Sequence, residues 1–411
     1  MTLGRYGLPL QVVFCRRCCI SNQRPSSVVE YRNSPESPKR AIAFDAEGVC
    51  DACRVAEQKA NTDWAERERE LRDLLDQHRS SDGSYDVIVP GSGGKDSFFA
   101  AHVLKHRYGM HPLTVTWAPH LYTAVGWENF QRWIHAGFDN LLETPNGRTH
   151  RLLTRLAVDR LFHAFQAFVI GQKAFPPKMA VMHKIPLVIY GEHEADYGNA
   201  RDESATPRRS AEYYARGDDE IYLGGASLKE LREDFGLTTA DLEPYMPARP
   251  EDLERVGVNV SYLGYYLKWR PQDCYYYAVE HGGFKPCPER TAGTYSKYVS
   301  LDDKADDWHY FQTFVKFGIG RATYDAAQEI RSGEISRDEG VALVRRYDGE
   351  YPVRFEKELL DYVSVDGFPR MTRESFMELC DSFRPEHLWR REGGEWKLRH
   401  AVWHEELAEA A

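Results

Sequence analysis

The sequence predicts an α/β protein organised around a doubly wound parallel sheet. Short apolar runs rich in β-branched residues occur at 85–90, 113–117 and 187–190, and stretches with helical spacing of apolar residues separate them. The first run stops at glycines and leads directly into a helical pattern, as in a strand–turn–helix unit. Strands that alternate with helices are typical of a parallel sheet, in which ligands bind at the carboxyl ends of the strands.

The composition is that of an ordinary globular protein. Of 411 residues 42% are hydrophobic, with no apolar run of about 18 residues and no secretory signal pattern, so a cytoplasmic location without a membrane span is expected. The 53 Lys and Arg residues against 63 Asp and Glu residues give a formal charge of -10. The protein therefore has no net positive electrostatic field that would attract a polyanion, and nucleic acid is not expected as a partner.

Changes of pattern divide the chain into four predicted regions. These are a cysteine-bearing, turn-rich segment at 1–63, a charged helical connector at 64–80, the strand-bearing domain at 81–325 with a polar insertion at about 201–250, and a mainly helical region at 326–411. In the last region one helix is predicted to end at Gly333, and the capping-box pattern from Ser336 to Glu339 begins the next.

The strongest functional signal is a glycine-rich loop between the first strand and the first helix of the sheet. Its sequence is Ser92-Gly93-Gly94-Lys95-Asp96-Ser97. Glycines let backbone N–H groups converge on phosphate oxygens, the helix N-terminus favours an anion, and Ser92, Lys95 and Ser97 add donors. It is not a Walker A loop, because Asp96 stands where that pattern needs Ser or Thr. The loop predicts ATP binding; a glycine-rich turn without a ligand is the alternative.

Two cysteine pairs near the N-terminus have the spacing of metal ligands. They are Cys15-x-x-Cys18 and Cys50-x-x-Cys53. Two such pairs deliver four thiolates tetrahedrally to one Zn²⁺, so a structural zinc ribbon is predicted. Reduced cysteines in turns are the alternative.

An acidic turn at 191–199 follows the third β-rich run, and in a parallel sheet it lies at the same edge as the glycine-rich loop. Mg²⁺ takes hard oxygen ligands together with phosphate oxygens, so Glu192 and Asp196 are predicted to contact Mg²⁺ or the substrate. A solvated acidic loop is the alternative. Gly191 is predicted to contact ATP, and Trp117, which ends the second run, either flanks the adenine or belongs to the core.

The Ser-Gly-Gly-Lys-Asp-Ser string resembles the pyrophosphate loop (PP-loop) of the ATP-pyrophosphatase superfamily, which has the adenine nucleotide alpha hydrolase-like fold. Further along, the chain resembles the N-acetyl sugar amidotransferases of this superfamily. The motifs that carry the resemblance are the cysteine pairs, the loop, the turn at 191–193, Lys268-Trp269, and the segments at 280–286, 293–298, 301–304 and 316–323.

This resemblance implies an ATP-dependent ligase that forms a C–N bond. Members of the family convert an acetamido group on a lipopolysaccharide or O-antigen sugar, or on a nonulosonic acid such as pseudaminic acid, into an acetamidino group. An amide oxygen attacks the α-phosphate of ATP, pyrophosphate leaves, and ammonia displaces AMP. Lys95 and Mg²⁺ neutralise the departing pyrophosphate. The predicted catalytic set is Lys95, Asp96, Glu192, His193 and Lys297.

Cations and aromatic residues in the second half of the chain are the predicted contacts of an anionic sugar. They are His281, Lys285, Arg290, Tyr295, Lys297, Tyr298, Lys304, Lys316 and Arg321. The cations would hold a carboxylate or a nucleotide diphosphate, and the tyrosines would orient a hydroxyl. His281 and His193 would transfer protons as ammonia attacks. Surface or structural roles are the alternative for each.

The chain carries no recognisable glutaminase. No cysteine nucleophile follows Met1, and no Gly-x-Cys-x-Gly elbow with a downstream His and Glu occurs. The resemblance therefore implies that a separate glutaminase subunit, with a cyclase-like ammonia-channelling partner, supplies ammonia.

Two other classes of function remain open at this point. A PP-loop sulfur transferase acting on tRNA or a sugar would use a cysteine persulfide, and Cys274, Cys287 and Cys380 have no assigned role. A non-enzymatic scaffold would use the ATP loop only as a docking module.

Overall fold

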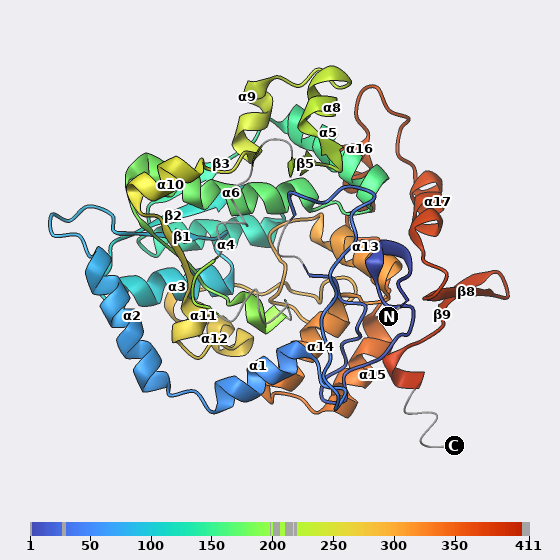
Figure 1. Cartoon of the computed structure of the whole chain (residues 1–411), viewed down its shortest axis with the longest axis horizontal. Coiled ribbons are helices and arrows are strands. Elements are labelled where there is room, and N and C mark those ends of the chain that lie inside the picture. Colours follow the sequence, from blue (N-terminus) through green and yellow to red (C-terminus); the bar gives the residue numbers. More distant parts are fainter. Residues whose placement is uncertain are drawn as a thin grey trace.

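A parallel sheet lies at the centre of the molecule (Figure 1). The computed structural model describes residues 2–26, 30–197, 199, 206–209, 217 and 220–404. Much of the first half of the predicted insertion at 201–250 lies outside these described residues. The rest of that region, from 220, is described and contains short strands and helices.

The sheet has five parallel strands in the order β3-β2-β1-β4-β7. They are β1 (Val87–Pro90), β2 (Pro112–Trp117), β3 (Asn140–Glu143), β4 (Leu187–Tyr190) and β7 (Asn259–Tyr262). This order confirms the predicted doubly wound parallel sheet, and it places the topological switch point between β1 and β4. β1, β2 and β4 coincide with the three predicted strands, whereas β3 and β7 were not predicted.

Alternate side chains of each strand enter cores on opposite faces of the sheet, as the period of a strand requires. Val87 and Val89 of β1 pack with one set of helices, while Ile88 packs with the other set. The first set is α2 (Trp64–His78), α3 (Lys95–His106), α4 (Ala124–His135) and α12 (Pro271–Gly282). The second set is α6 (Gln166–His183), backed by α5 (Gly147–Leu161). Both faces are thus covered by helices.

The remaining elements surround this centre. They are η1 (Arg5–Gly7), α1 (Asp51–Ala60), η2 (Glu194–Tyr197), β5 (Tyr222–Leu223), β6 (Ala226–Ser227), α8 (Leu228–Glu233), α9 (Thr239–Leu242), η5 (Glu243–Tyr245), α10 (Pro250–Val256), α11 (Leu263–Tyr266), α13 (Asp306–Phe317), α14 (Arg321–Ser332), α15 (Arg337–Tyr347), α16 (Glu356–Val363), α17 (Arg373–Phe383), β8 (Trp389–Glu392) and β9 (Glu395–Leu398). α14 ends at Gly333 with φ of 75°, and α15 begins at the Ser336 to Glu339 capping box, which confirms both predictions.

The N-terminal segment packs against helices from the far end of the chain. Its cysteines share a small core with Ala326 and Ala327 of α14 and with Val341 and Val344 of α15. Figure 1 shows this contact as dark blue chain beside the orange helices α14 and α15. The N-terminal segment is therefore anchored by the C-terminal region.

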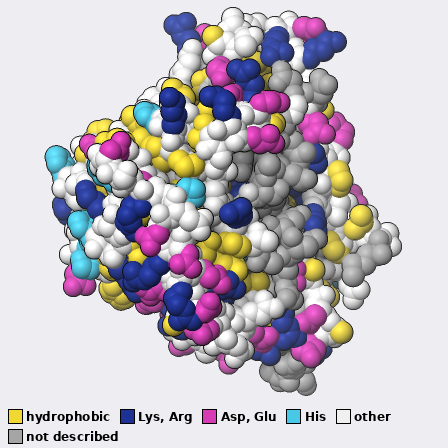
Figure 2. All heavy atoms as spheres, turned by 60° about the vertical axis from the view of Figure 1, so that its left-hand side comes forward, with side chains coloured by type: hydrophobic (Ala, Val, Ile, Leu, Met, Phe, Trp, Pro, Cys, Tyr) yellow, Lys and Arg dark blue, Asp and Glu magenta, His cyan; other side chains and the backbone are white. Residues whose placement is uncertain are grey.

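The surface carries charges of both signs. On the face in Figure 2, dark blue basic and magenta acidic side chains lie interspersed, without a broad field of one sign. Of the helices in the described part of the chain, none combines the length and the apolar character needed to cross a membrane.

Candidate active site

The PP-loop connects β1 to α3 at the carboxyl edge of the sheet. Gly93 has φ of 84°, and a Cβ atom there would lie 2.8 Å from the backbone of Phe130, so only glycine fits. Gly94 is the N-cap residue of α3, which begins at Lys95. The N-terminal backbone N–H groups of a helix have no partners within it, and here they face the switch point of the sheet.

Lys95 and Asp96 form an ion pair at the start of α3, and both line the cavity described below. Lys95 is only 6% exposed. Burial by itself would lower the pKa of Lys95, but the carboxylates of Asp96 and Glu192 more than offset it and raise that pKa. Lys95 is therefore a permanent cation at the mouth of the loop.

The turn after β4 brings Glu192 to the same place. A Cβ atom on Gly191 would lie 2.8 Å from the carbonyl oxygen of Asp96, so a glycine here lets the turn approach the PP-loop closely. Burial and the charge of Asp96 raise the pKa of Glu192 to about 7. Tyr197 lies near Glu192, with its hydroxyl 3.5 Å from Oε1. The two turns on either side of the switch point thus form one site.

Asp302 and Asp306 add two more carboxyl groups that the sequence analysis did not assign. Asp302 lines the same cavity as Ser92 of the PP-loop, and burial raises the pKa of the Asp302 carboxyl group. Burial and the neighbouring Asp302 raise the pKa of Asp306 well above its usual value. The 301–304 motif was an available signal for Asp302, because it contains two adjacent acids, whereas Asp306 lies outside that motif.

A cavity of about 590 Å³ opens from this edge of the sheet. Its lining includes the PP-loop residues Ser92 and Lys95, Glu192, Asp302 and Asp306. Cavities of about 300–1,000 Å³ hold small-molecule ligands, and in doubly wound sheets they lie at the switch point. The cavity has the size and place of a nucleotide and substrate site.

Another part of the cavity lining comes from α14, α13 and the loop before α13. Arg321 pairs with Asp325, with Nε 3.0 Å from Oδ1, and its guanidinium lies 4.2 Å from the centre of the Tyr310 ring. Glu329 accepts hydrogen bonds from the hydroxyls of Tyr295, at 2.7 Å, and Tyr298, at 3.3 Å. This wall offers both a cation and a carboxylate to a polar ligand.

The four cysteines of the N-terminal segment form a metal-binding cluster. The sulfur atoms of Cys15, Cys18, Cys50 and Cys53 are buried and all lie within 4.8 Å of one another. The backbone N–H groups of Arg17 and Cys50 donate to the Cys15 sulfur at 3.4 Å. Among the described residues this is the one group in which three or more ligand atoms are gathered tightly enough to hold an ion.

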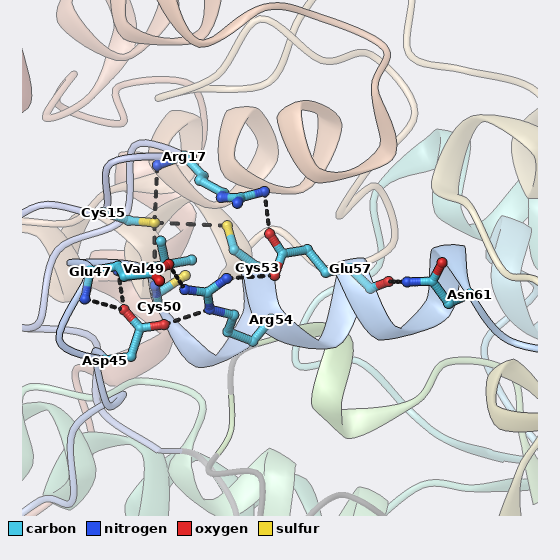
Figure 3. A network of polar contacts seen from close by, with 10 residues as sticks. All are labelled: Cys15, Arg17, Asp45, Glu47, Val49, Cys50, Cys53, Arg54, Glu57 and Asn61. Carbon is cyan, nitrogen blue, oxygen red and sulfur yellow. Dashed lines mark hydrogen bonds and ion pairs between the residues drawn. The ribbon is translucent and has the colours of Figure 1, made fainter.

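Charged residues surround this cluster, as Figure 3 shows. Arg54, one residue after Cys53 on α1, pairs with Asp45, Glu47 and Glu57. Asp45 also accepts the backbone N–H of Val49, at 3.0 Å, which holds the turn that leads into Cys50. The ligand-bearing turn and helix are thus fixed to each other independently of the sulfur atoms.

The cysteine cluster is linked to the cavity through α14. Arg331 lines the cavity, with Nη1 4.0 Å from the Cys18 sulfur and Nη2 3.0 Å from the carbonyl oxygen of Asp196. Lys59, at the end of α1, pairs with the Asp196 carboxylate at 2.9 Å. The turn that carries Glu192 is therefore tied to both the cysteine cluster and α14.

The C-terminal part of the chain matches a known family. Residues 292–402 match the family model described as LPS biosynthesis protein WbpG-like, C-terminal domain. This part of the chain is therefore similar to the C-terminal domain of WbpG-like proteins. The match confirms the expected family relation here, and the WbpG-like domain is the part that supplies Asp302, Asp306, Arg321 and Glu329 to the cavity.

Outside the WbpG-like domain, the similarity of this chain to known proteins is slight. No curated protein matches the sequence significantly. Among solved structures, the U34-tRNA thiolase NcsA from Methanococcus maripaludis, with its 4Fe-4S cluster, is similar with a TM-score of 0.29 and 13% identity, over 90% of this chain and 95% of that chain. A similarity of this extent says nothing about the substrate or the metal of the present chain.

Several residues predicted to bind the sugar lie outside the cavity lining, and four of them are cations already engaged elsewhere. Lys285 pairs with Glu128, Arg290 with Glu350 and Lys304 with Glu358, while Lys297 donates to the carbonyl oxygen of Pro288. Of the predicted sugar contacts, Tyr298, Lys316 and Arg321 line the cavity. Spacing along the chain did not distinguish these two groups, because chain folding decides which cations face inward.

Other predicted site residues also lie away from the lining. Trp117 packs against Gly171 of α6 and belongs to the core. His193 lies 3.2 Å from the carbonyl oxygen of Thr206, and His281 stacks on His102. Tyr295 stands behind Glu329, and Asp196 is held by Lys59.

Proposed function

We propose that this protein is an ATP-dependent amidotransferase that acts on an acetamido sugar of a bacterial surface polysaccharide or on a nonulosonic acid. The amide oxygen attacks the α-phosphorus of ATP, the bond to pyrophosphate breaks, and an O-adenylated imidate forms. Ammonia then adds to the imidate carbon, and AMP leaves with the former amide oxygen. The product is an acetamidino group.

One observation carries this proposal: a single cavity is lined both by the PP-loop and by the WbpG-like domain. The PP-loop provides a site for the phosphates of ATP, and the domain related to LPS biosynthesis provides another part of the lining. A sugar held by Arg321 and Glu329 would share this cavity with a nucleotide held near Lys95. An amide is too weak an electrophile for ammonia until its oxygen becomes a leaving group, which explains why ATP and sugar would share one cavity.

The residues around the PP-loop have complementary roles in this reaction. Lys95 neutralises negative charge as pyrophosphate departs, and the first turn of α3 orients the phosphates. Asp96, Glu192 and Asp302 are the carboxyl groups that would hold Mg²⁺, which supplies further charge neutralisation when bound between them and the phosphates. These groups are not gathered into a closed cage, as expected for an ion that also takes phosphate oxygens as ligands.

The cysteine cluster is proposed to hold a structural Zn²⁺. A tetrahedral ion with Zn–S bonds of about 2.3 Å places its sulfur ligands about 3.8 Å apart. The Cys15–Cys53 and Cys18–Cys50 sulfur pairs are each 3.8 Å apart. This spacing supports a single ion and a structural role, since all four positions around it are filled by protein.

Ammonia is proposed to come from a separate glutaminase subunit with a cyclase-like channelling partner. The isolated chain should then use ammonium but not glutamine. If the purified chain alone consumed glutamine in the reaction, the proposed division of labour would be wrong.

The direct test combines the purified chain with ATP, Mg²⁺, ammonium and a panel of acetamido sugars. Replacement of oxygen by NH lowers the product mass by about one unit, and AMP and pyrophosphate should form in step with it. Dependence of pyrophosphate release on the sugar separates an enzyme from a docking scaffold. Formation of ADP, or pyrophosphate release without any sugar product across the panel, would count against the proposal.

Sulfur transfer is an alternative function for a chain with this loop, and the structure supports it less well. A persulfide pathway needs a reactive thiolate, but Cys274, Cys287 and Cys380 are all buried and burial raises the pKa of each thiol. Cys274 is the one of the three whose pKa responds to the charges of Lys95, Asp96 and Glu192. A Cys274→Ser variant should keep its amidotransferase turnover; loss of all turnover in a folded, metal-loaded Cys274→Ser protein would favour sulfur transfer.

A further inference from the structure

Two further lysines line the same cavity, Lys316, which is buried, and Lys39, which is half-buried. Lys39 comes from the N-terminal segment and Lys316 from α13, and the two elements lie side by side (Figure 1). Lys316 is 5% exposed and donates one hydrogen bond, of 2.6 Å, to the carbonyl oxygen of Leu161 at the end of α5. Within the described residues this is its one side-chain hydrogen bond, and its Nζ otherwise lies 5.0 Å from the ring centre of Phe317 and 5.2 Å from that of Tyr6, so two N–H donors have no hydrogen-bond acceptor there.

The negative charge near Lys39 and Lys316 does not balance their two positive charges. Glu30 is the carboxylate that acts on both lysines, and it is shared with His163, at 3.7 Å, and with the side chain of Asn33, at 3.0 Å. Burial lowers the pKa of Lys39, and burial together with the charge of Lys39 lowers the pKa of Lys316 to about 7. The ammonium groups of Lys39 and Lys316 therefore repel each other in a region with little access to water.

Other cations of the cavity wall have strong partners. Lys95 pairs with Asp96, and Arg321 with Asp325. The side chain of Lys39, by contrast, makes neither a hydrogen bond nor an ion pair with any residue in the described ranges, although its backbone N–H donates to the carbonyl oxygen of Tyr6. Nearby, Nδ1 of His309 is buried without a hydrogen-bond partner in this part of the protein, and its ring lies 5.1 Å from that of His163. A buried polar atom and a cation without partners, both lining one cavity, indicate a ligand.

We propose that Lys39 and Lys316 form a second anion-binding subsite, which holds a carboxylate or phosphate group of the substrate while the PP-loop holds ATP. Nδ1 of His309 adds a polar contact to the same group or to the sugar. Two lysines with one shared counter-ion suit a singly or doubly charged anion, which restores charge balance and replaces lost hydration. The inference rests on the proposed function in taking the anion to be part of the acetamido substrate.

Binding can be measured without turnover, which separates this inference from the proposed reaction. Calorimetric titrations would use the full chain with Mg²⁺ and α,β-methylene-ATP, so that the PP-loop is filled. Three probes differ in charge: N-acetylneuraminic acid has a carboxylate, N-acetylglucosamine 1-phosphate has a phosphate, and N-acetylglucosamine has neither. Whichever anionic probe binds more tightly than the neutral sugar identifies the anion.

The wild-type chain should bind one anionic probe about tenfold or more tightly than N-acetylglucosamine, as expected of a charge-assisted contact. Lys39→Gln should remove most of this preference while leaving the affinity for the ATP analogue unchanged. Lys316→Met is the second variant and not the first, because it also removes the hydrogen bond from Lys316 to the end of α5. Lys229→Gln is the matched control, since Lys229 is an exposed lysine on α8 paired only weakly with Glu233, at 3.9 Å.

Two results would overturn the subsite. One is equal affinity of the wild-type chain for the neutral and both anionic probes. The other is a preference that survives in Lys39→Gln and Lys316→Met, or that disappears only in Lys95→Met, which would place the anion in the PP-loop. An anion preference lost in Lys39→Gln, in a chain that never forms an acetamidino product, would support the subsite and count against the proposed function alone.

Discussion

The indole Nε1 of Trp269 donates a hydrogen bond of 3.0 Å to Oδ1 of Asp96 in the PP-loop. The other carboxylate oxygen of Asp96 faces the ammonium group of Lys95. Trp269 is 5% exposed and lies just before α12, so it is fixed by packing. Asp96 is therefore oriented from both sides, and Trp269 acts as a positioning residue that does not itself line the cavity.

Trp269→Phe keeps an aromatic ring at this position but removes the indole N–H that donates to Asp96. We expect kcat to fall about tenfold, equivalent to about 1.4 kcal/mol, with a smaller change in KM for ATP. The reason is that Asp96 would lose its orientation while the phosphate contacts of the loop remain. Steady-state pyrophosphate release measures both constants. Trp127→Phe, at an exposed tryptophan, is the control; an equal loss in both variants would assign Trp269 a merely structural role.

Lys95→Met should lower pyrophosphate formation by about 10²-fold or more, because the departing charge loses its cation. The variant should also be less stable than wild type, since the buried Asp96 and Glu192 lose their counter-charge. Pyrophosphate release and thermal unfolding measure the two effects. Full activity in Lys95→Met would mean that the PP-loop does not bind the phosphates.

Cys18→Ser should lose the bound metal and lower the midpoint of thermal unfolding, because a structural metal contributes free energy to folding. Cys19 offers a matched control in the next position. It is also buried, but its thiol faces the carbonyl oxygen of Thr323 at 3.6 Å, outside the cluster. Metal analysis of both variants should show loss in the first and retention in the second. Equal metal content would contradict the four-cysteine site.

Asp196→Asn tests which of two roles this carboxylate has. The sequence favoured an Mg²⁺ contact, whereas the structure pairs it with Lys59 at 2.9 Å, with 12% and 18% of the two side chains exposed. We expect the dependence of activity on Mg²⁺ concentration to be unchanged and the free energy of unfolding to fall by about 1–3 kcal/mol. A large rise in the Mg²⁺ concentration needed for half-maximal activity would restore the metal role.

Lys316 should make stability depend on pH in an unusual direction. Its pKa is about 7 in the fold, through burial and the charge of Lys39, with Glu30 opposing and Arg5 assisting, against about 10.4 in an unfolded chain. Between these values the unfolded chain holds a proton that the folded chain lacks, so this residue makes the free energy of unfolding rise with pH. Denaturant unfolding at about pH 7 and about pH 9 should therefore show that Lys316→Met gains most over wild type at the lower pH. A difference that does not change with pH would show that Lys316 titrates normally.

Local sequence signals predicted the central part of the fold well. The run that became β1, the glycines after it and the helical pattern of α3 follow directly from residue type, because a buried strand and a phosphate-sized turn each demand particular side chains. β3 and β7 were not predicted. Each has only four residues, and β7 follows a polar region in which no local pattern stands out.

Residue types and spacing were enough to locate a glycine-rich loop between β1 and α3, two cysteine pairs with metal-ligand spacing, and an acidic turn after β4. These are short-range properties, since the residues that act together are neighbours in the chain. The folded structure was needed to show that Asp302, Asp306 and Lys39 line the same cavity as Lys95, whereas Lys285 and Lys304 do not. Charge and residue type are the same for an inward and an outward lysine, and the packing of distant elements selects between them.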